Sequence, residues 1–238
     1  RRLELHRVLA SSLERLGVDV RLGVTVRSIE DEPRGPVIVS LSDGSSLECT
    51  ALVGADGIRS QIRQMMFGDL EPTYTGFGVW RSMHAKPAGL DTKIMMMGVG
   101  IRLGIMPISR DQLYIFGTTR EPDKPFYAPG DWADLMLRKF SAFRGPATQF
   151  LEEVGRGSPV YYTSVEEVHL PLPWSRGRIA VIGDAAHSSS PFMGQGGAMA
   201  LEDAVVLADM LSEAGDIAAT LTAFGARRFQ RCKLVQDV

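Results

Sequence analysis

The chain contains 238 residues, 45% of them hydrophobic, and carries a formal net charge of −2 at pH 7. This length allows one large domain or two small ones, and a nearly neutral balance without a basic patch argues against nucleic-acid binding. Cys49 and Cys232 are far apart and unpatterned, which argues against a disulfide framework or a zinc site and favours a cytoplasmic location. No apolar run is long enough to span a bilayer.

The N-terminal segment combines one helix with several short strands. Residues 2–16 carry apolar side chains at helical spacing, and Gly17 can end this helix. Four runs with strand character follow, at 18–22, 24–30, 37–41 and 47–50. The last two flank Ser42-Asp43-Gly44-Ser45, which is a hairpin turn signal. We therefore expect a small β-meander.

Residues 51–63 form the first motif with chemical character. An apolar strand end, Leu52-Val53, leads into a tight turn at Gly54-Ala55-Asp56-Gly57, and a helix begins near Ser60. Asp56 therefore stands at a corner between a strand and a helix, with Arg59 and Arg63 nearby. Taken alone, this motif fits a ligand site and a plain Asp-Gly turn about equally well.

Residues 72–171 differ from the rest of the chain in being rich in predicted strands, as expected of an inserted subdomain. Strands are expected at 73–81, 94–99, 101–107, 112–119 and 160–169, and helices at 132–143 and 148–154. Asp131 is expected to be the N-cap of the first helix. Trp80 and Arg81 could hold a planar anionic substrate by stacking and charge, although a structural arginine on a strand is at least as good an interpretation.

The most informative stretch begins at Gly177. Residues 178–182 predict a buried strand, residues 188–197 a loop rich in Ser, Gly and Pro, and residues 198–211 an amphipathic helix. A further helix is expected at 221–235. The loop is longer than most strand-to-helix connections. We therefore favour a ligand-binding loop over a simple connection.

Asp184 follows the predicted strand directly, and three glycines stand at the start of the helix: Gly194, Gly196 and Gly197. Ligands of open α/β sheets bind at the carboxyl ends of strands, and the N-terminus of a helix attracts negative charge. A carboxylate in this place suits sugar or polyol hydroxyls. The sequence therefore predicts that Asp184 and the glycines hold a ligand.

No metal site is expected from the histidines. His6, His84, His169 and His187 lack the spacing of metal ligands, and His187 fits a structural role better than a catalytic one. The sequence also contains no GxSxG motif and no P-loop.

Three motifs together make the chain resemble the FAD-dependent aromatic hydroxylases, the para-hydroxybenzoate and salicylate hydroxylase group. Gly183-Asp184, followed by Pro191 and Gly194-Gln195-Gly196-Gly197, is similar to the second FAD motif of that family. Gly54-Ala55-Asp56-Gly57 with Ser60 and Arg63 is similar to its DG motif. Arg2-x-x-Leu5-His6 is similar to the helix start whose arginine reaches the FAD pyrophosphate.

The resemblance implies a mixed α/β (α+β) fold in which a FAD-binding, Rossmann-like layer carries an inserted β-rich substrate domain. The FAD-binding part would comprise residues 1–71 and 172–238, and the substrate-binding sheet residues 72–171. The family's GxGxxG segment is absent from these residues, so the layer is expected to be incomplete at its N-terminal end. A truncated chain and completion by another chain both fit this absence.

By the same resemblance, Asp184 would bind a ribityl hydroxyl, the backbone of Gly194–Ala198 would face the isoalloxazine, Val26 would lie near the adenine, and Asp56 would serve the pyrophosphate and the NAD(P)H path. The full set of implied cofactor-binding residues is Arg2, Val26, Asp56, Gly183, Asp184, Pro191, Gly194, Gln195, Gly196, Gly197 and Ala198. Ala198 departs from the family, because many relatives have Asn at this position.

The implied function is hydroxylation of a small aromatic or heteroaromatic substrate by O2 and NAD(P)H through a flavin C4a-hydroperoxide. The catalytic base is unknown, and Arg81, His84 and Tyr114 are the candidates. Two alternatives stay open: a FAD-dependent epoxidase with a long apolar pocket, and an inactive flavin-binding fragment. The protein would be a cytoplasmic monomer or homodimer without nucleic-acid partners.

Overall fold

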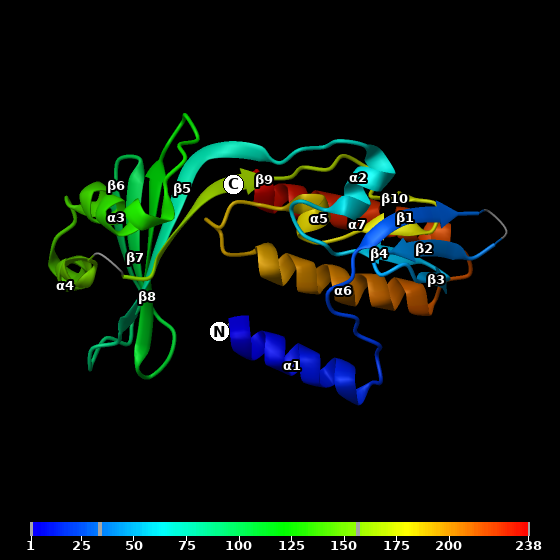
Figure 1. Cartoon of the computed structure of the whole chain (residues 1–238), viewed down its shortest axis with the longest axis horizontal. Coiled ribbons are helices and arrows are strands. Elements are labelled where there is room, and N and C mark those ends of the chain that lie inside the picture. Colours follow the sequence, from blue (N-terminus) through cyan, green and yellow to red (C-terminus); the bar gives the residue numbers. More distant parts are fainter. Residues whose placement is uncertain (1, 33–34, 156–157, 238) are drawn as a thin grey trace. The chain divides into compact units, whose positions relative to one another are not determined.

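A computed structural model of the chain describes residues 2–32, 35–155 and 158–237. Its elements are labelled in Figure 1 and form two compact units. Unit 1 contains Arg1–Arg7 and Tyr74–Val165, and unit 2 contains Val8–Thr73 and Glu166–Val238. The predicted mixed α/β architecture is confirmed. The assignment of FAD to one unit and of substrate to the other stays a prediction.

Unit 1 is built on a five-stranded sheet in the order β6-β7-β8-β5-β9. Its strands are β5 (Thr73–Ala85), β6 (Ile94–Gly98), β7 (Ile101–Pro107), β8 (Gln112–Arg120) and β9 (Val160–Glu167). Its helices are α3 (Trp132–Phe140) and α4 (Thr148–Glu153), with short 3-10 turns at Pro129–Asp131 and Gly145–Ala147. All five strands and both helices were predicted, but β5 continues four residues further than expected and α3 ends three residues earlier.

The helices of unit 1 pack on one face of this sheet. The shared core includes Trp80, Leu103, Ile105, Leu113 and Ile115 from strands, with Met136, Phe140 and Phe150 from helices. Gly117 allows the close approach, because a Cβ there would lie 2.0 Å from the Phe140 ring. Successive side chains of a strand point to opposite faces. Residues between these core positions therefore face away from α3 and α4. Asp131 precedes α3 but makes no side-chain capping bond, contrary to the prediction.

Unit 2 contains two three-stranded sheets and most of the helices. The predicted meander is confirmed and has the order β1-β2-β3, with β1 (Val26–Asp31), β2 (Val37–Leu41) and β3 (Ser46–Cys49). The second sheet has the order β10-β11-β4, with β4 (Leu52–Gly54), β10 (Ser175–Arg176) and β11 (Ile179–Val181). The helices are α2 (Gln61–Phe67), α5 (Asp184–His187), α6 (Gly196–Ser212) and α7 (Ile217–Gln236). A buried core of strand residues such as Ala180 and Val181 and helix residues such as Leu207 and Phe224 joins them.

Helix α1 (Arg2–Arg15) was predicted correctly, but the strand expected at 18–22 is wrong. Val18, Val20 and Leu22 alternate in the sequence, yet all three are exposed and no described strand pairs with them. Alternation indicates a strand only where a neighbouring strand supplies hydrogen bonds and a face to bury. The apolar side chains of α1 are also exposed, from Leu3 to Leu13.

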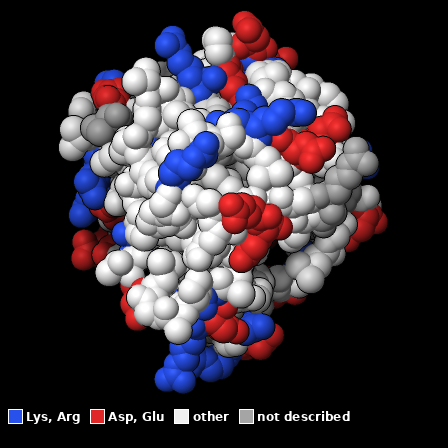
Figure 2. Space-filling view, turned by 90° about the vertical axis from the view of Figure 1, so that its left-hand side faces the viewer, with Lys and Arg blue, Asp and Glu red and all other residues white. Residues whose placement is uncertain are grey.

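The surface shows no concentration of charge on the face drawn in Figure 2. Basic and acidic side chains are scattered among uncharged ones, without a continuous basic patch among the described residues of that face. Within the described parts of the chain, no helix is long and apolar enough to cross a membrane.

Candidate functional site: two aspartates at one edge of a parallel strand pair

Strands β4 and β11 of unit 2 run parallel and end at the same edge of their sheet. Leu52 pairs with Ile179, Val53 with Ala180 and Gly54 with Val181. The backbone continues this pairing, because the Ile182 N–H donates to the Gly54 carbonyl at 3.0 Å. Asp56 and Asp184 therefore follow the carboxyl ends of adjacent strands, which is where ligands of open α/β sheets bind.

Asp184 is exposed, whereas every other residue from Ile179 to Ser188 is buried. Its carboxylate has no hydrogen-bonding or charged partner among the residues that the structure describes. Gly183, immediately before it, has φ +59°, a left-handed conformation that favours glycine. A Cβ at Gly183 would also lie 3.2 Å from the Cβ of Ala200. The turn after β11 thus presents one free carboxylate to solvent.

The N-terminus of α6 lies beside this carboxylate. A Cβ placed on Gly196, the first residue of α6, would lie 3.9 Å from Asp184 Oδ1. The N-cap residue Gln195 makes no side-chain capping bond, and the first turn contains no acidic residue. The helix begins two residues earlier than predicted and has 17 residues. Its exposed first turn therefore offers backbone N–H groups and the positive end of the helix dipole.

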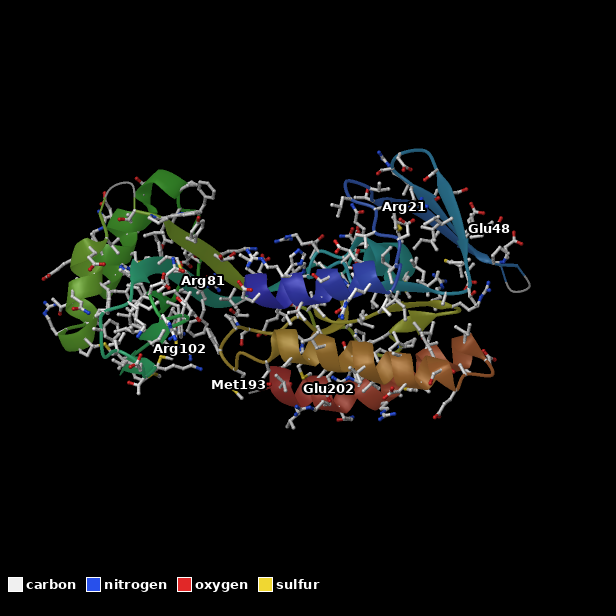
Figure 3. The ribbon with its side chains drawn as sticks, turned by 90° about the horizontal axis from the view of Figure 1, so that it is seen from below. Arg21, Glu48, Arg81, Arg102, Met193 and Glu202 are labelled. Carbon is white, nitrogen blue, oxygen red and sulfur yellow. The ribbon has the colours of Figure 1, made fainter. Side chains whose placement is uncertain are left out.

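The loop that leads into α6 is exposed as well. Pro191, Gly194 and Gln195 are exposed, as are Gly197 and Ala198 inside the helix. Gly194 has φ +63°, so it too needs the freedom of glycine. Figure 3 labels Met193, which is 48% exposed in this loop. The structure thus places Gly183 and the first residue of α6 beside Asp184, and it leaves much of the loop between them exposed.

Asp56 is also exposed, but its carboxylate is engaged within the chain. Asp56 Oδ1 accepts the Ser60 hydroxyl at 2.5 Å, and Oδ2 accepts the Ile62 N–H at 3.1 Å. Ser60 is the N-cap of α2, and its Oγ accepts the Arg63 N–H at 2.9 Å. The two side chains together accept the Ile62 and Arg63 N–H groups at the start of α2. Asp56 therefore stabilises a helix start, and its role toward a cofactor stays a prediction.

Neither arginine of this motif makes a hydrogen bond with Asp56. The fully buried Arg63 guanidinium donates to the carbonyls of Ala185 at 2.8 Å and Ile58 at 2.7 Å, and Leu70 accepts a further bond. Burial lowers the pKa of Arg63 below its ordinary value. Arg59 is exposed and pairs with Glu166 at 2.6 Å. Arg63 thus links the turn after β4 to the residue that follows Asp184.

Two other predicted cofactor residues lie in β1 and α1. Val26 opens β1 opposite Leu41 and lines a shallow pocket of about 430 Å³ with Arg27, Gln61, Gln64 and Met65. Arg2 opens α1, but its side chain lies outside the described part of the structure.

The catalytic candidates of unit 1 separate onto two faces of its sheet. Arg81 and Tyr114 line one pocket of about 610 Å³, together with Ser82, Met83, Ile108, Gln112 and Tyr161. Arg81 and Arg102 come from β5 and β7 of this sheet (Figure 3). His84 contacts α4 instead, since its Nδ1 lies 2.9 Å from Glu153 Oε2 and its ring meets Phe150 edge-on. Trp80 is fully buried, so its ring cannot stack on a substrate.

A buried charge network supports this sheet from the helix side. Glu121 accepts hydrogen bonds from Thr119 at 2.7 Å and Tyr162 at 2.6 Å, and it pairs with Lys139 at 2.9 Å. Burial acts to raise the pKa of Glu121, but these three partners outweigh it and the pKa is lowered. The network was not predicted, because no sequence pattern brings residues 119–121, 139 and 162 together.

A second buried carboxylate, Asp203, was also missed. It lies on α6 with 0% exposure, on the same helical face as the buried Met199 and Leu207. A signal was available, because an acidic residue four positions from Met199 and four from Leu207 occupies a core position of an amphipathic helix. A charge at a core position needs partners, which here come from Gly183, His187 and Arg228.

Comparison with known proteins identifies the family of the chain. The family model of the FAD binding domain matches residues 2–133 and 163–232. The chain is 36% identical over 213 residues to the aurachin C monooxygenase/isomerase of Stigmatella aurantiaca, covering 88% of this chain and 55% of that protein. It is 32% identical to the 2-heptyl-3-hydroxy-4(1H)-quinolone synthase of Pseudomonas aeruginosa, covering 99% of this chain and 61% of that protein.

Among solved structures, Klebsiella pneumoniae HpxO in complex with FAD and uric acid matches with a TM-score of 0.84 and 29% identity, covering 96% of this chain and 60% of that one. The chain thus spans less than two thirds of the length of these relatives. The resemblance to FAD-dependent hydroxylases is confirmed. The chain belongs to the FAD binding domain family.

Proposed function

We propose that the protein is a FAD-dependent monooxygenase that uses NAD(P)H and O2 to hydroxylate a small aromatic or heteroaromatic substrate. Membership of the FAD binding domain family supports the cofactor. The names of the relatives, a monooxygenase/isomerase and a quinolone synthase, support oxygen chemistry on heteroaromatic rings. The complex of HpxO with FAD and uric acid points the same way.

The observation that carries this proposal is the exposed Asp184 carboxylate, which has no partner among the described residues and lies beside an α6 N-terminus that no side chain caps. A carboxylate accepts hydrogen bonds from hydroxyl groups, which suits the ribityl chain of FAD. The first turn of α6 would stabilise negative charge on the N1/C2=O side of the isoalloxazine. Bound FAD would supply the redox chemistry and oxygen activation that side chains lack.

The pocket of unit 1 is the proposed substrate surface. Met83, Ile108 and Tyr161 supply apolar and aromatic area, while Arg81 and Tyr114 supply a positive charge and a hydroxyl. Most small-molecule sites combine a largely apolar lining with a few polar groups. Arg81 favours hydroxylation of an aromatic acid or phenol over the epoxidase alternative, which predicts no arginine in this lining.

FAD uptake tests the proposal first. The protein as its gene encodes it should be purified, equilibrated with FAD and separated from free FAD, and its visible absorbance recorded. We expect a yellow protein with flavin bands, whose NAD(P)H oxidation is stimulated by members of a panel of aromatic acids. A colourless protein that retains no FAD would contradict the proposal and favour the inactive-fragment alternative.

A substitution at Arg81 tests the substrate class. Arg81→Met removes the charge from the pocket while keeping much of its volume. We expect the KM for aromatic carboxylates to rise about ten-fold or more, because a charge-assisted hydrogen bond is lost, and the KM for neutral phenols to stay constant. Arg120→Met, at the exposed end of β8, is the matched control. Equal changes for charged and neutral substrates would contradict an anion-binding role.

We further propose that the protein works in the cytoplasm as a monomer or homodimer. Both of its cysteines are unpaired, which suits a reducing compartment. Light scattering of the purified protein would determine the oligomeric state, and an assembly larger than a dimer would contradict the proposal.

A further inference from the structure

One buried side chain ties the turn that carries Asp184 to two helices. Asp203 Oδ2 accepts the Gly183 N–H at 2.8 Å and lies 2.6 Å from His187 Nε2, while Oδ1 accepts Arg228 Nε at 2.7 Å. These partners come from the turn after β11, from α5 and from α7, and Asp203 itself comes from α6. A single carboxylate therefore connects four consecutive elements of unit 2.

Backbone hydrogen bonds also hold Gly183, the residue before Asp184. The Gly183 carbonyl accepts the N–H groups of Ala186 and His187, each at 2.9 Å. Gly183 is thus held on its N–H side by Asp203 and on its carbonyl side by α5. Because Asp184 is the next residue, the direction of its exposed side chain depends on how Gly183 is held. Asp203 also lies two turns into α6, the helix whose first residue lies beside Asp184.

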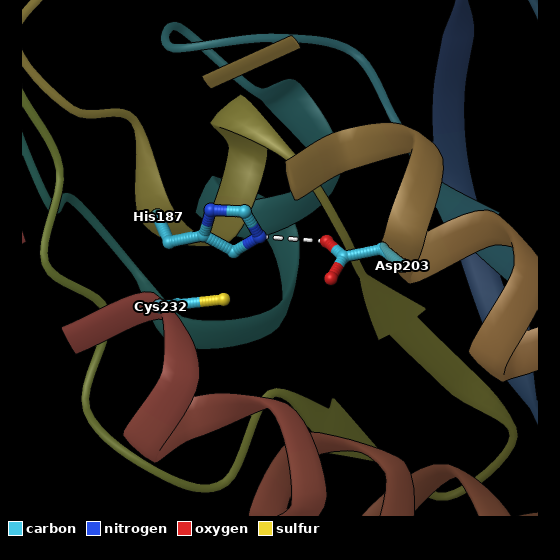
Figure 4. A group of neighbouring side chains, drawn as sticks. All are labelled: His187, Asp203 and Cys232. Atoms are coloured by element: carbon cyan, nitrogen blue, oxygen red, sulfur yellow. Dashed lines mark hydrogen bonds and ion pairs between the residues drawn. The ribbon is translucent and has the colours of Figure 1, made fainter. Parts of the chain in front are cut away.

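The charges around Asp203 favour a fixed hydrogen-bond network over a metal site. Figure 4 shows His187, Asp203 and Cys232, whose potential ligand atoms all lie within 4.8 Å of one another. Both oxygens of Asp203 already accept hydrogen bonds, and the buried Arg228 cation lies against one of them. Burial, reinforced by Asp203, raises the pKa of Cys232 to about 12, so its thiol stays neutral rather than acting as a thiolate ligand.

Resting on the proposed function, we propose that Asp203 is a positioning residue for the flavin site: it fixes the Gly183 turn so that the Asp184 carboxylate, beside the first turn of α6, is held in the direction of the ribityl chain. Asp203 is fully buried and would not touch the cofactor itself. Its contribution to FAD affinity must therefore pass through Asp184, and this dependence distinguishes it from a residue that only stabilises the fold.

A double-mutant cycle on FAD affinity tests this dependence. Asp203→Asn replaces the two acceptor oxygens by one oxygen and an amino group. The single oxygen cannot accept the hydrogen bond from Arg228 and also those from Gly183 and His187. We expect Asp203→Asn to weaken FAD binding about ten-fold or more in the otherwise unchanged protein. In the Asp184→Ala background it should cause little further loss. Asp209→Asn, an exposed position on the same helix, is the matched control and should leave FAD affinity unchanged.

The outcomes separate this inference from the proposed function. If the unchanged protein binds no FAD, the proposed function fails. If FAD binds and Asp184→Ala weakens it, but Asp203→Asn has no effect or the same effect in both backgrounds, only the positioning role is overturned. If Asp203→Asn does not fold, His187→Leu is the second variant, because it removes one hydrogen-bond donor to Asp203 and leaves no large cavity. The same double-mutant cycle with Asp184→Ala then tests the positioning role of Asp203.

Discussion

Two aspartates stand at the same edge of one parallel strand pair, yet their carboxylates are used differently. Asp56 follows β4 and accepts hydrogen bonds from Ser60 and Ile62 at the start of α2. Asp184 follows β11, and its carboxylate has no partner within the described ranges of the chain. The comparison teaches that a carboxylate at a strand end can be part of the fold or available to a ligand. The hydrogen bonds of each carboxylate distinguish the two uses.

The largest effect should come from Arg63, which joins the two turns. Arg63→Ala removes hydrogen bonds to Ile58 on one side and Ala185 on the other, and leaves a cavity. We expect the free energy of unfolding to fall by about 3 kcal/mol or more. Chemical denaturation would measure this change. Arg59→Ala, whose side chain is 64% exposed, is the control and should cost less than about 1 kcal/mol. Equal small effects would contradict the linking role of Arg63.

Acid pH should reduce the contribution of Asp203 to the free energy of unfolding, because protonation weakens the hydrogen bonds that hold the turn before Asp184. Burial acts to raise the pKa of Asp203, but hydrogen bonds and charge from His187, Gly183 and Arg228 outweigh it, so the pKa lies below its ordinary value of 3.8. A carboxyl with a lowered folded-state pKa stabilises the fold above its unfolded-state pKa and loses this contribution as the pH falls. The stabilising contribution of Asp203 should therefore be lost as the pH falls below about 3.8.

The measurement is the free energy of unfolding of wild type and Asp203→Asn from neutral pH into this acid range. We expect the difference between them to shrink as the pH falls. The neighbouring charged or titratable groups are His187, Glu202, Arg228 and Cys232, and all of them are kept in the variant. A difference that stays constant through the acid range would contradict a lowered pKa of Asp203.

A smaller effect on stability should distinguish the two aspartates directly. Asp56→Ala should lower the free energy of unfolding by about 1 kcal/mol, because the start of α2 loses an acceptor for the Ile62 N–H. Asp184→Ala should change it by less than about 0.5 kcal/mol, since the side chain is exposed and unpartnered among described residues. Thermal or urea unfolding of both variants without FAD decides the point, and a larger loss for Asp184→Ala would reverse our interpretation.

The sequence predicted what depends on local pattern. The meander, the strands of unit 1 and helix α6 were visible in periodicity and turn residues, because each is specified by neighbours in the chain. The motif around Asp184 was also visible, since Gly183 and Gly194 adopt positive φ angles that favour glycine.

What failed depends on partners that are distant in the sequence. The apolar alternation at 18–22 forms no strand, because no described strand lies beside it. His84 and Tyr114 are alternative candidates for the base, and only the structure shows that the pleat of the sheet turns them to opposite faces. Asp56 and Asp184 looked alike in the sequence, and only the contacts of Ser60 and Ile62 showed that one carboxylate is already engaged.

The most direct test of the central claim is a FAD titration of wild type, Asp184→Ala and the exposed control Asp209→Ala. Each variant is made in the protein as its gene encodes it, with no other change. We predict that Asp184→Ala weakens FAD binding about ten-fold or more, because a hydrogen bond to a charged acceptor is lost. Its unfolding without FAD and the affinity of the control should both stay unchanged. An Asp184→Ala variant that binds FAD as tightly as wild type would contradict the claim that this strand end holds the flavin.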